Sequence, residues 1–227
     1  MPRIAQVVVP DVPHHVTQRG NRREDVFFSD ADRGAYLSLL AEYCQKHPLE
    51  VVAYCLMTNH VHLVVVPRTA ASLGAAMKPV HLRYAQHVNW TQGISGRLWQ
   101  GRFFSCPMDE RHLCAAVQYV ERNPVRAGMG MVDAAEEYPW SSAAAHCGQR
   151  HDPLLVDPFG LVESIGDWSR WLAERDDESA TAALRKNTHT GRPLGSEGFL
   201  DRVEGMLGRT VRPREVGRPR KESAKSN

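Results

Sequence analysis

Two apolar, β-branched runs lie close together in the chain, at residues 49–56 and 61–66. Only Met57-Thr58-Asn59-His60 separates them, so the connection between them is a short turn. Runs of this composition, joined by a short turn, form paired strands. The sequence therefore predicts an antiparallel hairpin near the centre of a sheet, which limits the fold more than any other feature of the chain.

The flanking segments predict a sheet with helices packed on it. A first strand should stop at the turn signal Gly20-Asn21, and a helix should start at the capping residue Ser29. The order β-α-β-β-α-β-α predicts an α+β fold with a ferredoxin-like antiparallel sheet. Besides the hairpin, we expect strands at 12–19 and 102–106 and helices from 29 to about 47, from 72 to about 90 and from 110 to about 122.

Charge is distributed unevenly along the chain, although the net charge is only +2. Residues 131–183 contain three Lys or Arg against eleven Asp or Glu, whereas the segments on either side are basic. We expect a core domain over 1–130, an acidic helical extension over 131–190 that packs on it, and a basic, partly mobile Gly-Arg-Pro tail over 191–227. This layout suits a polyanionic partner.

The cysteines and the apolar runs bear on the compartment. Five cysteines, an odd number without a CxxC pair, argue against a disulfide framework and against a cysteine-rich zinc module. No secretory signal is recognisable, and no apolar run approaches the ~20 residues that a membrane span needs. The sequence predicts a cytoplasmic protein with reduced thiols and no membrane contact.

His60-Val61-His62 is the first group of residues that could carry chemistry. Side chains at positions i and i+2 of a strand share a face, so both imidazoles can reach one ion. Imidazole is a common ligand of divalent metals. The alternative is two half-exposed strand histidines that bind nothing.

Tyr119 and Asn123 form the second group, because residues four apart on a helix lie one above the other. A phenol is a weak nucleophile until a cation or a base assists it. The amide oxygen of Asn123 suits a hard cation such as Mg²⁺ or Mn²⁺. The alternative is an ordinary helix–sheet tyrosine followed by an asparagine near a helix end.

Together, these groups resemble the single-tyrosine HUH transposases, in which two histidines flank a bulky residue on a strand. The resemblance is closer to the REP-associated tyrosine transposase subgroup and extends from Pro13 to Gly128. The middle position of the HUH motif is occupied by Val61. The segments that carry the resemblance are His14-His15-Val16-Thr17-Gln18-Arg19-Gly20-Asn21-Arg22, Met57-Thr58-Asn59-His60-Val61-His62-Leu63, Trp99-Gln100-Gly101-Arg102-Phe103 and Tyr119-Val120-Glu121-Arg122-Asn123-Pro124-Val125-Arg126-Ala127-Gly128.

The resemblance implies that residues 1–130 are an HUH catalytic domain that cuts and rejoins single-stranded DNA. His60, His62 and Asn123 would hold Mg²⁺ or Mn²⁺, and Tyr119 would form a 5′-phosphotyrosine. Rejoining would need no nucleotide cofactor, because the covalent bond conserves the energy of the broken linkage. The implied partners are palindromic hairpin repeats in single-stranded DNA, and the implied protein is a nucleoid-associated monomer.

Residues that could contact DNA are basic, polar or aromatic and lie near the predicted site. Phosphate contacts would position the strand, and aromatic rings could stack on bases. For Phe104 we expect a core position instead, and His15 or His14 could approach the active site without being a ligand. The candidates are Arg19, Asn21, Arg22, Arg23, Trp99, Arg102, Arg122, Arg126, Arg218, Arg220 and Lys221.

Two other functions remain open at this stage. A DNA-binding protein that no longer cuts would bind hairpins without forming a covalent adduct. A metal-dependent hydrolase of small phosphoesters would use His60 and His62 but would not need Tyr119.

Overall fold

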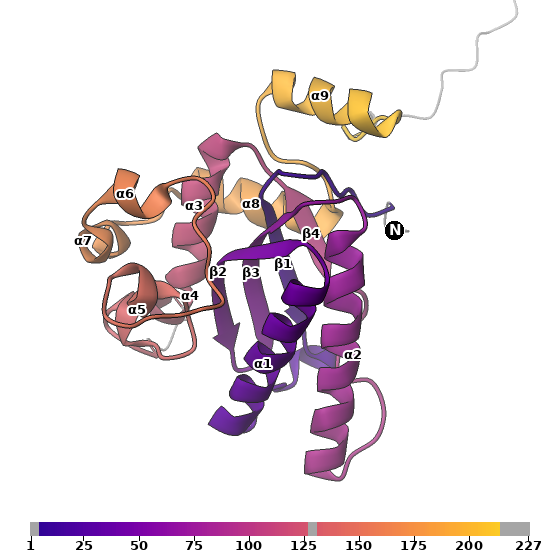
Figure 1. The fold of residues 1–227 in the computed structure, drawn as a ribbon, viewed down its shortest axis with the longest axis vertical. Helices are drawn as coiled ribbons and strands as arrows, with labels where there is room; N and C mark the ends of the chain where they lie inside the picture. The colour runs from indigo at the N-terminus through magenta and orange to yellow at the C-terminus, as the bar shows by residue number, and fades with distance from the viewer. Residues whose placement is uncertain (1–4, 127–130, 214–227) are drawn as a thin grey trace, which may run out of the picture.

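The computed structural model describes residues 5–126 and 131–213 of the 227-residue chain. Its strands form one four-stranded antiparallel sheet in the order β2-β3-β1-β4 (Figure 1). The predicted α+β, ferredoxin-like architecture is confirmed. The strands are β1 (His14–Arg19), β2 (Leu49–Met57), β3 (His60–Pro67) and β4 (Phe104–Pro107).

Helices cover both faces of the sheet, and more of them follow in the extension (Figure 1). Ser29 caps α1 in a capping box with Asp32, as its residue type predicts. Helices of the core are α1 (Asp30–Lys46), α2 (Ser72–Gln92), α3 (Glu110–Glu121) and α4 (Asn123–Arg126). The later ones are α5 (Ala143–His146), α6 (Leu161–Ile165), α7 (Trp168–Ala173), α8 (Glu178–Thr190) and α9 (Glu197–Leu207). Two 3-10 turns are η1 (Asn21–Arg23) and η2 (Ala135–Glu137).

The main differences from the sequence-based expectation concern the starts of two strands and the C-terminal segment. The first strand begins at His14 rather than at residue 12. The fourth strand begins at Phe104 rather than at residue 102. Helix α9 lies inside the segment 191–227 that was expected to be an extended basic tail. Its apolar residues Phe199 and Val203 pack on Val7 and Val9 near the start of the described chain, so this part of the segment is anchored by hydrophobic contact.

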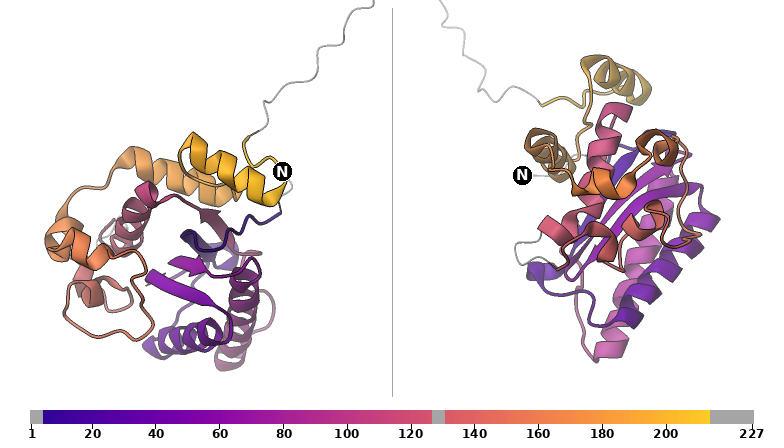
Figure 2. Two further views of the ribbon diagram at one scale, coloured as in Figure 1. Left: turned by 45° about the horizontal axis from the view of Figure 1, so that its top comes forward. Right: turned by 90° about the vertical axis from the view of Figure 1, so that its left-hand side faces the viewer.

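The alternation of side chains along β3 divides the interior into two cores. Val61, Leu63 and Val65 face α1 and α2, while Val64 and Val66 belong to the core under α3. Figure 2 shows α1 and α2 on one side of the sheet and α3 and α8 on the other. Helices cover both faces of β3, which explains the continuous apolar run from Leu63 to Val66.

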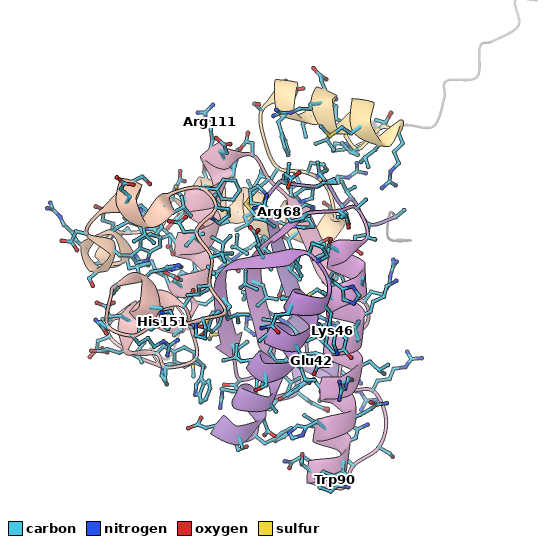
Figure 3. The ribbon with its side chains drawn as sticks, viewed as in Figure 1. Glu42, Lys46, Arg68, Trp90, Arg111 and His151 are labelled. Atoms are coloured by element: carbon cyan, nitrogen blue, oxygen red, sulfur yellow. The ribbon has the colours of Figure 1, made fainter. Side chains whose placement is uncertain are left out.

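The open end of the hairpin is tied by a charged cluster. Arg68, labelled in Figure 3, directly follows β3 and pairs with Glu50 at 2.6 Å and with Asp11 at 2.8 Å. The three side chains are partly exposed, so we expect a contribution of at most about 1 kcal/mol for each pair.

The acidic extension attaches to the core through a buried carboxylate. Glu121, at the end of α3, is fully buried and accepts hydrogen bonds from the side chains of Ser142, His146 (2.6 Å) and Trp168 (2.8 Å). The extension also covers the edge of the sheet, where Leu56 of β2 donates its backbone N–H to the carbonyl of Trp140 at 2.9 Å.

Replacing Gly20 by Ala should destabilise the fold. A Cβ at this position would lie 2.1 Å from the carbonyl oxygen of Glu24 and 2.8 Å from the side chain of Val26. We expect Gly20→Ala to lower the free energy of unfolding by about 1–3 kcal/mol, as overpacking does. Urea denaturation measures this change.

Gly34 provides the matched control, because a Cβ there meets nothing within 4 Å and the residue lies inside α1. Gly34→Ala should raise the free energy of unfolding by about 0.5–1 kcal/mol. A loss of stability in Gly34→Ala equal to that in Gly20→Ala would contradict the steric explanation.

Candidate active site

His60 and His62 lie on the same face of β3, turned toward α3, as their two-residue spacing predicts. Their ring centroids are 4.9 Å apart. The Nδ1 atom of His60 lies 2.7 Å from the side-chain oxygen of Asn59, and the Nδ1 atom of His62 lies 2.9 Å from Nε2 of His15. On each ring the second nitrogen, Nε2, is the atom that remains for a ligand.

Burial keeps both rings neutral at physiological pH. Burial first, and then the nearby charge of Arg19, lower the pKa of His60 to about 3. The pKa of His62 is also well below its usual value, first because of burial and then because of the neighbouring His60 and His15. A neutral imidazole offers a lone pair, which is the form that binds a metal. A cavity of about 370 Å³ opens onto His62.

Tyr119 projects from α3 onto the histidine face. Its ring centroid lies 5.3 Å from that of His62 and 5.7 Å from that of His15, in both cases edge to face. The guanidinium of Arg126 stands 4.1 Å from the centre of the ring. Arg185, from α8, donates from Nε to the tyrosine hydroxyl at 3.3 Å. The hydroxyl therefore lies next to a permanent positive charge.

Asn123 is buried one turn beyond Tyr119. Its amide nitrogen donates to the carbonyl of Tyr119 at 3.1 Å and to that of Val120 at 3.5 Å. These bonds use the nitrogen, so the amide oxygen is the atom that could serve a cation. The role of Asn123 as a third ligand stays a prediction.

The donor set suits a divalent cation. Two neutral imidazoles with engaged Nδ1 atoms, together with the amide oxygen of Asn123, are nitrogen and oxygen ligands of the kind that Mn²⁺ or Mg²⁺ accepts. Within the described residues, no group of three or more His, Cys, Asp or Glu side chains could hold a metal ion.

The region that contains the histidines and the tyrosine matches a known family. Residues 8–123, just over half of the chain, match the family described as "Transposase IS200 like". The chain belongs to this family. The matched region runs from the segment before β1 to Asn123, so it includes both histidines and the tyrosine.

Two known proteins are similar to this chain. A REP-associated tyrosine transposase from Haemophilus influenzae is 23% identical over 118 residues, which cover 47% of this chain and 66% of that protein. The match thus spans slightly less than two thirds of that relative. A solved structure of a REP-associated tyrosine transposase bound to a REP hairpin superposes with a TM-score of 0.53 and 16% identity, covering 69% of this chain and 92% of the other. At this identity the structural likeness shows a shared fold.

Several predicted DNA contacts surround the cavity beside His62. Arg19 and Arg23 line it, and Arg102 lines a larger cavity of about 700 Å³ next to it. Arg22 is exposed and Asn21 is partly buried in the same turn. Arg22 and Arg23 both have left-handed backbone angles, with φ of 54° and 66°, which non-glycine residues adopt only when their surroundings hold them.

The two aromatic residues exchange the roles expected from the sequence. Trp99, a candidate for base stacking, is only 8% exposed and donates its indole N–H to the carbonyl of His81 at 2.8 Å. Its ring packs in the core with Tyr84, which favours a structural role. Phe104, expected in the core, is only half-buried, stacks on His189 of α8 and lines both cavities.

Arg122 and Arg126 are mostly buried rather than displayed on a surface. Both pair with Asp176 of the extension, Arg122 at 3.4 Å and Arg126 at 2.9 Å. Arg126 also donates to the carbonyl of Tyr119. These contacts hold the end of α3, so the expectation of phosphate contacts for the two arginines conflicts with their burial. The predicted contacts Arg218, Arg220 and Lys221 lie outside the described residues.

Sequence reasoning missed two residues of the site, Arg185 and Thr188 on α8. Thr188 lies 2.8 Å from Nδ1 of His15, and Arg185 bonds the tyrosine. Their three-residue spacing places both on one face of the helix. That spacing was the only signal, and many helices contain it.

None of the helices in the described part of the chain is long and apolar enough to span a bilayer.

Acid should destabilise the metal-free protein through its buried histidines. Burial lowers the pKa of His15 and His81 to about 3 and that of His14 to about 4, whereas unfolded histidine titrates near 6.5. Below pH 6.5 these histidines bind protons in the unfolded chain but stay neutral in the folded chain. The free energy of unfolding should therefore fall as pH drops from 6.5 to 4, by up to about 1.4 kcal/mol per pH unit for each histidine.

Urea denaturation at a series of pH values measures this slope. His81 lies on α2 and bonds the hydroxyl of Tyr36, so His81→Gln removes one titrating group without replacing Tyr119 or either histidine of β3. The variant should show a shallower pH dependence than the wild-type protein. Parallel curves for the two proteins would contradict the prediction.

Proposed function

We propose that this chain is a metal-dependent endonuclease and strand transferase of single-stranded DNA, acting at hairpin-forming repeats through a 5′-phosphotyrosine. The single observation that carries the proposal is the meeting of Tyr119 with His62 on one face of the sheet, at 5.3 Å between ring centroids. The family and the hairpin-bound structural relative support DNA as the partner.

The chemistry assigns the central role to the phenol of Tyr119. Its oxygen forms a bond to phosphorus while the bond from phosphorus to the 3′ oxygen breaks. The hydroxyl proton passes to solvent, and the departing 3′ oxygen takes up a proton. Attack by a 3′-hydroxyl on the phosphotyrosine reverses these steps and rejoins the strand without a nucleotide cofactor.

Arg185 assists this step from α8. A guanidinium next to the hydroxyl oxygen stabilises the negative charge that develops there and can also contact the phosphate. Arg126, above the ring, restricts its orientation. Tyr119, the histidines and Arg185 belong to one chain, which supports a monomer as the active unit.

His60, His62 and Asn123 would hold the divalent cation. When bound, Mg²⁺ or Mn²⁺ polarises a phosphoryl oxygen and orients the phosphate. The two histidines are neutral and fixed by hydrogen bonds before any ligand arrives, so little side-chain freedom is lost on binding.

A DNA strand would follow the basic rim of the two cavities. Arg19 and Arg23 beside His62 can contact phosphates, as can Arg102 in the neighbouring cavity. The half-buried ring of Phe104, which stacks on His189, lines both cavities and could stack on an unpaired base that enters them.

The decisive experiment is denaturing electrophoresis of a labelled single-stranded hairpin with the protein and Mn²⁺. We expect a metal-dependent band at the mass of protein plus DNA, absent in Tyr119→Phe because the attacking oxygen is missing. Hairpin binding without this band would favour a non-cleaving DNA-binding protein. Cleavage by Tyr119→Phe would favour a hydrolase that uses the histidines alone.

A second prediction tests the contribution of α8 to the reaction. Arg185→Ala removes a charged hydrogen bond to the nucleophile and should slow adduct formation about tenfold to 100-fold. Lys186→Ala removes an adjacent, exposed cation on the same helix and should change the rate less than threefold. Single-turnover kinetics at saturating DNA measure both rates, and equal effects of the two variants would argue against a specific role of Arg185.

A further inference from the structure

A chain of buried hydrogen bonds connects α8 to the proposed metal ligand His62. The hydroxyl of Thr188 lies 2.8 Å from Nδ1 of His15, and Nε2 of His15 lies 2.9 Å from Nδ1 of His62. The exposed fractions of Thr188, His15 and His62 are 2%, 1% and 4%. The two rings are nearly parallel, at 9°, with centroids 5.1 Å apart.

The donor and acceptor roles along these hydrogen bonds can be arranged in two ways, with the hydrogens pointing toward α8 or toward His62. A neutral imidazole carries one N–H and one lone pair, so only one proton can lie between the two rings. If His62 donates from Nδ1, then His15 donates from its own Nδ1 to Thr188, and Nε2 of His62 keeps its lone pair. If Thr188 donates to His15, then His62 carries its hydrogen on Nε2. Only the first direction allows His62 to bind a cation.

Cys106 favours the first direction. Its thiol donates to the carbonyl of Pro107 at 3.5 Å, which leaves the sulfur as an acceptor. Cys106 is fully buried, which raises the pKa of its thiol, and the Thr188 hydroxyl acts in the opposite direction, as a hydrogen-bond donor to the sulfur does. A threonine that donates to Cys106 presents an oxygen lone pair to His15, so the direction of each bond agrees with the next.

His60 reaches the same tautomer by a shorter route. The side-chain oxygen of Asn59 can only accept, and the amide nitrogen of the same side chain donates to the carbonyl of Arg23 at 3.0 Å. His60 therefore donates from Nδ1. If the hydrogen bonds from Thr188 through His15 (the relay) fix the same Nδ1–H tautomer in His62, both Nε2 atoms are available to one ion.

We propose that Thr188 is a positioning residue that acts through His15 to hold His62 in its Nδ1–H tautomer, leaving Nε2 free for a divalent cation. This inference rests on the proposed function, since it concerns the metal ligands of that site. It gives the C-terminal extension a part in metal binding, although α8 contributes no ligand.

The test uses the full chain without DNA. Thr188→Val removes the hydroxyl at nearly constant volume, whereas Thr188→Ser retains it. Thr190→Val is the matched control, because Thr190 is exposed on the same helix and bonds only backbone carbonyls among the described contacts. Two measurements apply to each variant: the ¹⁵N NMR signature of the His62 ring without metal, and the dissociation constant of Mn²⁺ by electron paramagnetic resonance.

We expect the Nδ1–H tautomer of His62 in the wild-type protein, in Thr188→Ser and in Thr190→Val, and a mixture of tautomers in Thr188→Val. Loss of this kind of support typically weakens metal binding about 10-fold to 100-fold, so Thr188→Val should show such a loss and Thr188→Ser should not. A wild-type His62 protonated on Nε2, absence of Mn²⁺ binding, or an unchanged tautomer and affinity in Thr188→Val would overturn the inference.

The outcome is separable from that of the proposed function. A protein that shows the expected tautomer and Mn²⁺ affinities but forms no DNA adduct would overturn the DNA chemistry and support the relay. Adduct formation by the wild-type protein, with the same Mn²⁺ affinity in Thr188→Val, would overturn the relay alone.

Discussion

The two-residue alternation of β3 is the constraint on which the rest of the structure depends. It sends Val61, Leu63 and Val65 into the core under α1 and α2, and it turns His60 and His62 toward α3. A shift of one residue in the pairing with β1 would exchange these two sets and bury imidazoles among aliphatic side chains. The packing of the apolar side chains thereby determines on which face of the sheet the side chains of His60 and His62 lie.

The C-terminal extension has more than a packing function in this arrangement. Helix α8 brings Arg185 to the hydroxyl of Tyr119 and Thr188 to His15, while Asp176 neutralises two arginines behind the tyrosine. These contacts lie beyond the region that matches the family, which ends at residue 123. The region that matches the family therefore contains Tyr119 and the histidines, and the extension contains the groups that contact them.

Local patterns were sufficient to predict the fold, whereas Tyr119, His60 and His62 were singled out by resemblance to a family and their chemical roles stay a prediction. Alternating and helical periodicity, the Ser29 cap and the short turn after residue 56 each depend on neighbours in sequence, and the structure follows them. The contacts of α8 could not be predicted, because they join residues as far apart as His15 and Thr188 and depend on how the extension folds back. Trp99 and Phe104 show the same limit: composition indicates an aromatic surface, but burial decides which ring is accessible.

The buried carboxylate of Glu121 has a consequence for Tyr119, two residues before it. Positions two apart on a helix point in nearly opposite directions, so Glu121 faces the extension while Tyr119 faces the histidines of the sheet. Its partners Ser142, His146 and Trp168 act as a clamp against rotation of the helix about its own axis. The angular setting of the phenol is thus governed from the side of the helix that faces away from the histidines. Substitutions in the extension that weaken these hydrogen bonds would therefore change the orientation of the Tyr119 side chain before they disturbed the sheet.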